Sequence, residues 1–118
     1  MAEFNILTEV RQQPHAVIIR STGYFNDAGG DKLRTIVQGL IEKGEQTFVF
    51  NLQGSPVVNS IGISCILDST EVITTEVQGT VVFCGLTKAV AEAFKLVGIL
   101  KLYRAFDTED AALASLPK

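Results

Sequence analysis

Several residue types are scarce in this chain, and each scarcity argues against a class of protein. The 118 residues include no tryptophan, one methionine, one histidine, two cysteines and three prolines. The single histidine, His15, cannot form a zinc site with the two cysteines at any familiar spacing. Cys65 and Cys84 lie inside apolar segments, where a free cysteine behaves as a small hydrophobic residue. We therefore expect two buried thiols, no disulfide, no metal and no other cofactor.

Clusters of one charge and long apolar runs are also missing. Ten Lys and Arg residues against thirteen Asp and Glu residues give a net charge of −3, and the charges are interspersed. A nucleic-acid-binding protein usually carries a basic stripe, so we expect no nucleic acid partner. No apolar run approaches the roughly 18–20 residues of a membrane-spanning helix, and residues 1–13 lack the apolar core of a signal peptide. We expect a cytoplasmic protein without a membrane segment.

What the chain does contain is enough apolar residues, 47%, to form a packed core. Its length predicts one domain spanning residues 1–118. Alternating or continuous apolar segments predict strands at 3–10, 15–25, 47–52, 80–86 and 99–106. The nearly continuous apolar run at 47–52 is typical of a strand buried on both faces. Apolar residues at helical spacing predict helices at 28–46, 60–74, 88–98 and 109–116. In the first of these, Asp31 suits the first turn and Gly44 suits the C-terminal stop.

The order of these segments predicts the fold class. The turn RQQP at 11–14 joins the first two strands, which we expect to pair as a hairpin. Helices and strands then alternate, and this alternation requires crossover connections between parallel strands. We expect an α/β fold with a small mixed sheet of four or five strands and about four helices.

The sequence contains few residues that are placed to act in catalysis. His15 leads into a strand, and most acidic residues fall on predicted helix exteriors or turns. The glycines of AGG (28–30) lack the spacing of a phosphate-binding loop. Cys65, Cys84 and Ser64 are possible nucleophiles, but no base accompanies them. We therefore expect a protein that is not an enzyme.

The stretch VVNSIGIS (57–64) places a small polar pair between an extended segment and a helix. Asn59 and Ser60 are residue types that cap helices, and a cap stabilises a helix by roughly 1 kcal/mol. The free N–H groups and the dipole of a helix N-terminus also favour a negative group, so a phosphate on Ser60 would fit there. From the residues alone, both a simple cap and a modified or binding serine are open.

NLQGSPVVNSIGISCIL (51–67) resembles the central motif of STAS domains, the domains of sulphate transporters and anti-sigma-factor antagonists. That motif combines a short strand, D-S-S/T-G-L and a helix. GYFN (23–26) resembles the family's G-x-L/F-D turn, and residues 80–116 are similar to the second half of the family. The resemblance covers nearly the whole chain.

The resemblance implies a regulatory protein. In the antagonist branch, an anti-sigma factor that is also a serine kinase phosphorylates the motif serine, and a PP2C-type phosphatase reverses this. The unphosphorylated form binds the anti-sigma factor and frees the sigma factor. Ser60 falls on the serine position and Gly62 on the glycine position. The implied phosphorylation site is Ser60, and the implied partner-binding residues are Asn26, Asn59, Ser60, Ile61, Gly62 and Ser64.

Three residues depart from the family pattern. Asn59 and Asn26 stand where the family usually has Asp, and Ile61 replaces the second Ser or Thr. Amides in place of carboxylates remove negative charge, which eases a phosphate on Ser60 but also removes charges that a partner could recognise. Ile61 either packs against the sheet or serves as a docking contact. The departures leave open an alternative: a constitutive STAS interaction subunit of a signalling or transport assembly.

Overall fold

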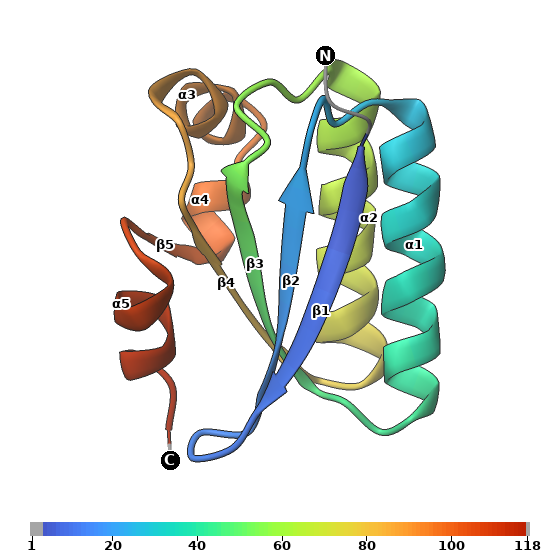
Figure 1. The fold of residues 1–118 in the computed structure, drawn as a ribbon, viewed down its shortest axis with the longest axis vertical. Helices are drawn as coiled ribbons and strands as arrows, with labels where there is room; N and C mark the ends of the chain where they lie inside the picture. The colour runs from blue at the N-terminus through green and yellow to red at the C-terminus, as the bar shows by residue number, and fades with distance from the viewer. Residues whose placement is uncertain (1–3, 118) are drawn as a thin grey trace.

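The computed structural model describes residues 4–117, and its strands form one five-stranded sheet (Figure 1). The strands lie in chain order and are β1 (Asn5–Arg11), β2 (Ala16–Thr22), β3 (Thr47–Gly54), β4 (Thr80–Cys84) and β5 (Arg104–Phe106). β1 pairs antiparallel with β2 as the predicted hairpin, and all later neighbours pair parallel. The predicted mixed α/β sheet is therefore confirmed, with five strands.

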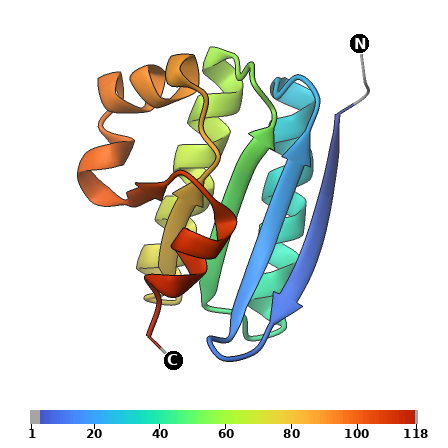
Figure 2. The same cartoon turned by 60° about the vertical axis from the view of Figure 1, so that its left-hand side comes forward.

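Within residues 4–117, five helices cover the sheet unequally. They are α1 (Asp27–Glu42), α2 (Ser60–Glu76), α3 (Lys88–Leu96), α4 (Ile99–Leu102) and α5 (Glu109–Ala114). α1 to α4 lie on one face, and α5 lies on the other (Figures 1 and 2). Right-handed crossovers between strands that follow one another across a sheet place their helices on the same face, which explains the crowded side.

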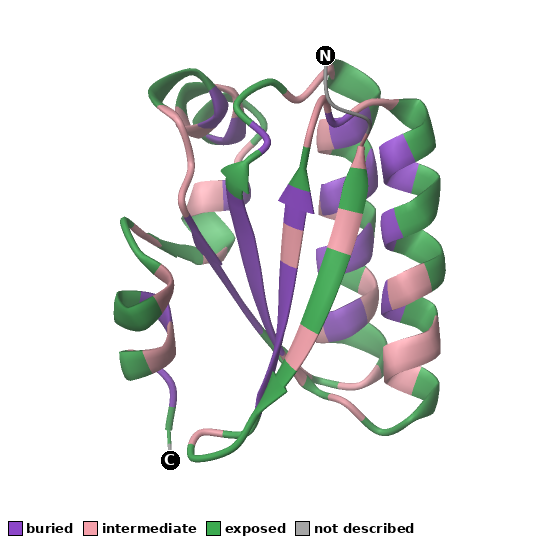
Figure 3. Cartoon of the chain, viewed as in Figure 1, coloured by how far each residue is buried: buried purple, intermediate pink, exposed green. Residues whose placement is uncertain are grey.

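Two apolar clusters follow from this layering. The larger one joins the sheet to α1–α4 and includes Phe25, Phe50, Phe83, Phe94 and Ile99. The smaller one joins the sheet to α5 and contains Ile18, Val49, Val82, Cys84 and Ala112. β2, β3 and β4 are buried from both sides, whereas β1 at the edge is mostly exposed (Figure 3). The nearly continuous apolar run at 47–52 thus has the doubly buried position predicted for it.

The prediction of a strand over residues 99–106 is wrong for the first half of that range. Residues Ile99–Leu102 form α4, and only Arg104–Phe106 pair with β4. Gly98 has φ +83°, the left-handed conformation that ends α3 and turns the chain into a new helical turn. Ile99 is then fully buried. A short apolar run fits a buried strand and a buried helical turn equally, so periodicity could not separate them.

Other boundaries shift by a few residues. The strand predicted at 3–10 begins at Asn5, and Glu3 lies outside the described residues. The strand predicted at 15–25 ends at Thr22. α1 begins at Asp27, so Asp27 and not Asp31 occupies its first turn, and the predicted stop at Gly44 is confirmed by φ +93°. No helix among the described residues has the length and apolar character needed to cross a bilayer.

Candidate functional site

Two loops meet at the carboxyl ends of β2 and β3, the upper end in Figure 1. The Phe25 N–H donates to the Val57 carbonyl at 3.0 Å, and the Asn59 N–H donates to the Phe25 carbonyl at 2.9 Å. Phe25 and Val58 form an isolated parallel bridge between the loops. Below them the Ser21 and Ser55 hydroxyls form a buried hydrogen bond of 2.8 Å. The starts of α1 and α2 are thereby fixed side by side.

Each of these helices begins with an asparagine cap. The Asn26 side-chain oxygen accepts from the Gly29 N–H at 3.2 Å, and the Asn59 oxygen accepts from the Gly62 N–H at 2.7 Å. Asn59 also donates its Nδ2 to Asp27 Oδ1 at 3.3 Å, which links the two helix starts directly. The predicted structural role of Asn59 as a cap is therefore confirmed.

Asp27 is the residue that sequence reasoning missed. The sequence indicated only that amides at positions 26 and 59 remove negative charge near Ser60. The structure places the Asp27 carboxylate against Asn59. No local pattern could have shown this, because the contact joins residues 32 positions apart. Its only sequence signal is that Asp27 follows the turn GYFN (23–26).

Ser60 is the first residue of α2 and is exposed. Among the hydrogen bonds of the described residues, none involves the Ser60 hydroxyl or the backbone N–H groups of Ser60 and Ile61. The first N–H groups of a helix have no partner within it and carry the positive end of its dipole. A phosphate on the Ser60 hydroxyl would therefore lie beside free donors at a site that favours negative charge.

Gly62 supports this site from below. A Cβ atom at Gly62 would lie 2.6 Å from the Phe25 carbonyl oxygen and 3.0 Å from Val58 Cγ1. Both contacts belong to the paired loops, so α2 can press against them only if position 62 lacks a side chain. Gly62 is buried, and because it has no side chain the start of α2, including Ser60, can pack close to the two paired loops.

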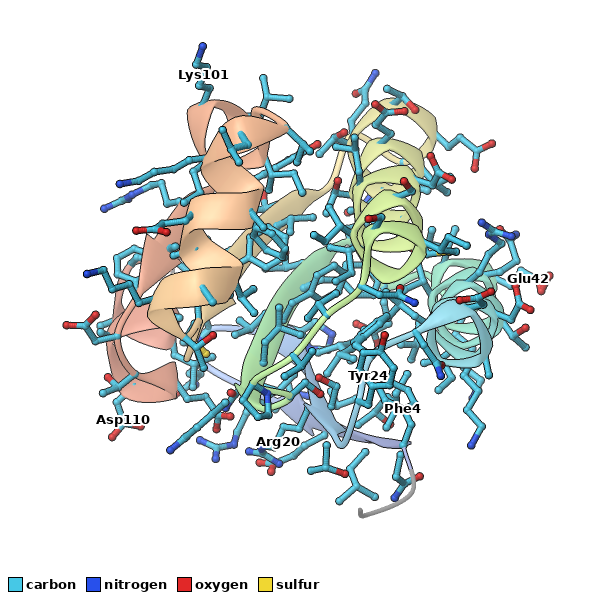
Figure 4. All side chains as sticks on the ribbon, turned by 90° about the horizontal axis from the view of Figure 1, so that it is seen from above. Phe4, Arg20, Tyr24, Glu42, Lys101 and Asp110 are labelled. Carbon is cyan, nitrogen blue, oxygen red and sulfur yellow. The ribbon has the colours of Figure 1, made fainter. Side chains whose placement is uncertain are left out.

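Apolar side chains flank the serine. Ile61 is 51% exposed and Val57 is 58% exposed. The alternative that Ile61 packs against the sheet is thus wrong, and its side chain is available for docking. Ser64 is exposed one turn further along α2. Figure 4 looks down on this end of the molecule, where Phe4 and Tyr24 lie near the start of α1.

The possible nucleophiles lack the environment that catalysis requires. His15 lies at the start of β2, at the opposite end of the sheet, and contacts Gln12 and Glu45. Burial raises the pKa of the Cys65 thiol and raises that of Cys84 to about 12. Both thiols are free and buried, as predicted. Among the described residues, no group of His, Cys, Asp and Glu side chains is arranged to hold a metal ion.

A second polar cluster lies on the opposite face of the sheet and fastens α5. Arg20 donates to both carboxylate oxygens of Glu109, at 2.8 and 2.7 Å, and to Glu9 at 2.9 Å. Asn51 donates to Glu109 at 2.8 Å. The hydrogen bonds from Arg20 lower the pKa of Glu109 despite its partial burial. Every polar group of this cluster has a partner, so its role is to hold α5 on the sheet.

Comparison with known proteins finds relatives of similar sequence and solved structures of similar fold. The chain is 28% identical over 93 residues, 79% of each chain, to BtrV of Bordetella bronchiseptica, which is named as an anti-sigma factor antagonist. Its fold matches a Thermotoga maritima protein of the same naming, with a TM-score of 0.85, 13% identity and coverage of 96% and 95%. It also matches phosphorylated SpoIIAA from Bacillus, with a TM-score of 0.73, 18% identity and coverage of 93% and 97%.

The family assignment covers most of the chain. The STAS domain model matches residues 8–112, which extend from β1 into α5 and include both capped helix starts. The five-stranded mixed sheet, the paired loops and the exposed serine at the start of α2 thus belong to one matched unit. This protein is a member of the STAS domain family.

Proposed function

We propose that this protein is an anti-sigma-factor antagonist that binds an anti-sigma factor with serine kinase activity, and that phosphorylation of Ser60 switches this binding off. The observation that carries the proposal is the exposed Ser60 at the first position of α2, whose hydroxyl and neighbouring N–H groups have no hydrogen-bond partner among residues 4–117. The antagonist naming of BtrV and of SpoIIAA, whose structure has been solved in phosphorylated and unphosphorylated forms, supports it.

The contact surface would be built around the start of α2. Its proposed members are Asn26, Asn59, Ser60, Ile61, Gly62 and Ser64. Ile61 supplies an exposed apolar contact, while Asn59 and the neighbouring Asp27 supply polar groups at its rim. A surface of this kind, with an apolar centre and a polar rim, is typical of protein–protein interfaces.

Phosphorylation would act on the surface and leave the fold unchanged. It adds about −1.5 to −2 charges, which the N-terminus of α2 stabilises. Those charges would lie beside Ile61 and close to the Asp27 carboxylate, which accepts a hydrogen bond from Asn59. A partner that covers Ile61 would have to desolvate the phosphate, so the complex would be lost. A PP2C-type phosphatase would restore it, and we place the cycle in the cytoplasm.

The proposal assigns the chemistry to the partners, and this chain serves as a substrate and a ligand without activity of its own. The raised pKa values of Cys65 and Cys84 keep both thiols protonated at neutral pH, which supports this assignment. We propose no nucleic acid partner, because the net charge of −3 would oppose binding to phosphates.

The test uses the purified protein with anti-sigma factor kinases from the same organism. We expect Mg-ATP and one of these kinases to add a single phosphate, which mass spectrometry should locate on Ser60. Ser60→Ala should bind that kinase normally and resist release by ATP. Ser60→Asp should weaken binding by about tenfold to a hundredfold, or about 1.4–2.7 kcal/mol. Thr75→Ala, which removes an exposed hydroxyl at the far end of α2, is the matched control, and it should be phosphorylated and released like the natural chain.

A phosphate on another residue, or unchanged binding of Ser60→Asp, would contradict the switch. A stable complex that ignores both ATP and Ser60→Asp would instead support the constitutive interaction subunit.

A further inference from the structure

One glycine of this chain differs from the others in its surroundings. Of the ten glycines, nine have a positive φ or a neighbouring atom 3.1 Å or less from the place of a Cβ atom. Gly39 has neither, because a Cβ atom there would meet nothing within 4 Å. It lies in the interior of α1, where glycine is less favourable than almost any other residue. Neither backbone conformation nor close packing among residues 4–117 therefore requires a glycine at this position.

Gly39 faces a groove between α1 and the edge strand β1. The groove consists of two adjoining hollows of about 430 and 350 Å³, which share Ile6, Thr35 and Ile36. Gly39 and Leu40 continue its wall along α1. Apolar or small residues therefore line the middle of the groove, and a side chain at position 39 would occupy part of the groove.

The opposite wall of the groove is a strand with one unpaired side. β1 is the first strand of the sheet, and only β2 pairs with it among the described elements. Its outer backbone N–H and C=O groups can accept a further strand. A strand added there would lie beside Ile6 and Thr8 and pass over Gly39. Backbone pairing along an edge, with side-chain pockets beside it, is a recurring mode of peptide recognition.

The position of α1 limits what can occupy the groove. In Figure 1, α1 stands to the right of β1, beside the edge of the sheet. A second copy that paired antiparallel with β1 about an axis perpendicular to the sheet would place its own α1 on the same face, against this α1. A single extended segment needs only the width of one strand. The geometry therefore favours a peptide strand over a second folded copy.

Charge at the groove indicates the chemistry of that strand. Lys32 lines one hollow and Lys43 the other, and both are exposed. The lining contains one acidic residue, Asp31, which lies 3.8 Å from Arg34, and Arg34 also lies 3.5 Å from Asp68, so the lining carries two positive charges against one negative charge. On a chain with a net charge of −3, this groove is flanked by two lysines. An acidic segment fits it better than a basic one.

We propose that the groove between β1 and α1 binds an extended segment of a partner protein, which adds to β1 as a strand, places apolar side chains against Ile36 and Leu40, and carries acidic residues toward Lys32 and Lys43. The absence of a side chain at Gly39 leaves space in the groove for this segment. The site is separate from the start of α2, so it adds a second partner surface to a STAS domain and does not depend on the proposed switch at Ser60.

The test is a selection of random peptides displayed on phage against the whole protein. We expect the enriched peptides to alternate apolar residues and to carry acidic flanks. In NMR titrations they should shift the amides of Asn5–Arg11 and of Gly39. Gly39→Leu should fold normally and weaken binding by about tenfold or more. Gln38→Leu, which adds the same bulk at a neighbouring exposed position of α1, should bind as the natural chain does.

Further variants separate the possible outcomes. Gly39→Ala should raise the melting temperature, because alanine suits a helix interior better, and should weaken peptide binding. N-methylated versions of a selected peptide should lose affinity, since they cannot complete a strand. Ser60→Asp should bind the peptides unchanged. Equal enrichment on Gly39→Leu, shifts confined to other elements, or dimerisation of the free protein through β1 would overturn the proposal.

Discussion

The starts of α1 and α2 are built alike, and the first helical residue of each determines what it can do. Each begins with an asparagine cap that accepts from a glycine N–H three residues later, Asn26 to Gly29 and Asn59 to Gly62. The first helical residue is Asp27 in α1 and Ser60 in α2. α1 thus carries a permanent carboxylate at its positive end, whereas α2 carries a hydroxyl that becomes charged only when phosphorylated.

The comparison shows how a switch can be added without a new fold. A helix N-terminus stabilises a negative group in either case. The two helix starts differ because the charge of an aspartate is permanent, whereas a serine becomes charged only when it is phosphorylated. The hydrogen bond between Asn59 and Asp27 sets the permanent charge close to the conditional one. We infer that this closeness sharpens the difference in surface charge between the two states of Ser60.

The largest expected difference between the two helix starts lies in their glycines. Gly62→Ala would place its Cβ 2.6 Å from the Phe25 carbonyl oxygen, so the backbone must move. We expect it to lower the free energy of unfolding by about 2–3 kcal/mol. Gly29→Ala would meet only the Phe4 ring at 3.1 Å, which can shift, and should change stability by less than about 1 kcal/mol. Urea denaturation of both variants measures this, and equal losses would contradict it.

The caps should have similar and intermediate effects. Asn59→Ala and Asn26→Ala each remove a side-chain acceptor from a helix N–H group, so each should destabilise the protein by about 1 kcal/mol. Asn59→Asp keeps the cap but brings a second carboxylate near Asp27. It should therefore be less stable than the natural chain in low salt and recover in high salt. Thermal denaturation at two salt concentrations tests this, and a loss independent of salt would oppose the electrostatic explanation.

Exchanging the first residues of the helices should have the smallest effect. Ser60→Asp makes α2 begin like α1 and should stabilise the protein by about 0.3–1 kcal/mol in low salt. Asp27→Ser makes α1 begin like α2 and should cost a similar amount. Chemical denaturation of the two single variants and of the double variant measures the exchange. A large loss in Ser60→Asp would mean that the negative charge disturbs the fold, contrary to the proposed surface switch.

Local sequence was sufficient for most elements, because their signals lie within a few residues. The hairpin, the buried strand at β3, the asparagine cap of α2 and the stop at Gly44 all follow from short patterns. The strand predicted at 99–106 failed because an apolar run carries no information on whether Ile99 packs from a helix or from a strand. The outcome was decided by the left-handed Gly98 and by the core into which Ile99 fits.

The candidate site divides in the same way. The resemblance placed Ser60 at the centre of the site, and the residues themselves indicated a helix start there. Sequence could not place Asp27 beside Asn59, nor show that Ile61 is exposed, because both depend on how two loops pair after β2 and β3. The glycines illustrate the limit clearly, since Gly62 and Gly39 both lie inside helices and only their surroundings differ.

The residues alone predict where α2 begins, which serine stands there and that the chain forms a mixed α/β sheet. Those features depend on hydrogen bonds and apolar spacing over one or two turns of chain. The packed structure is needed to show that Gly62 must lack a side chain, that Asp27 reaches Asn59 and that Gly39 faces an open groove. These depend on contacts between segments far apart in the chain, and their geometry exists only once the sheet and helices have packed.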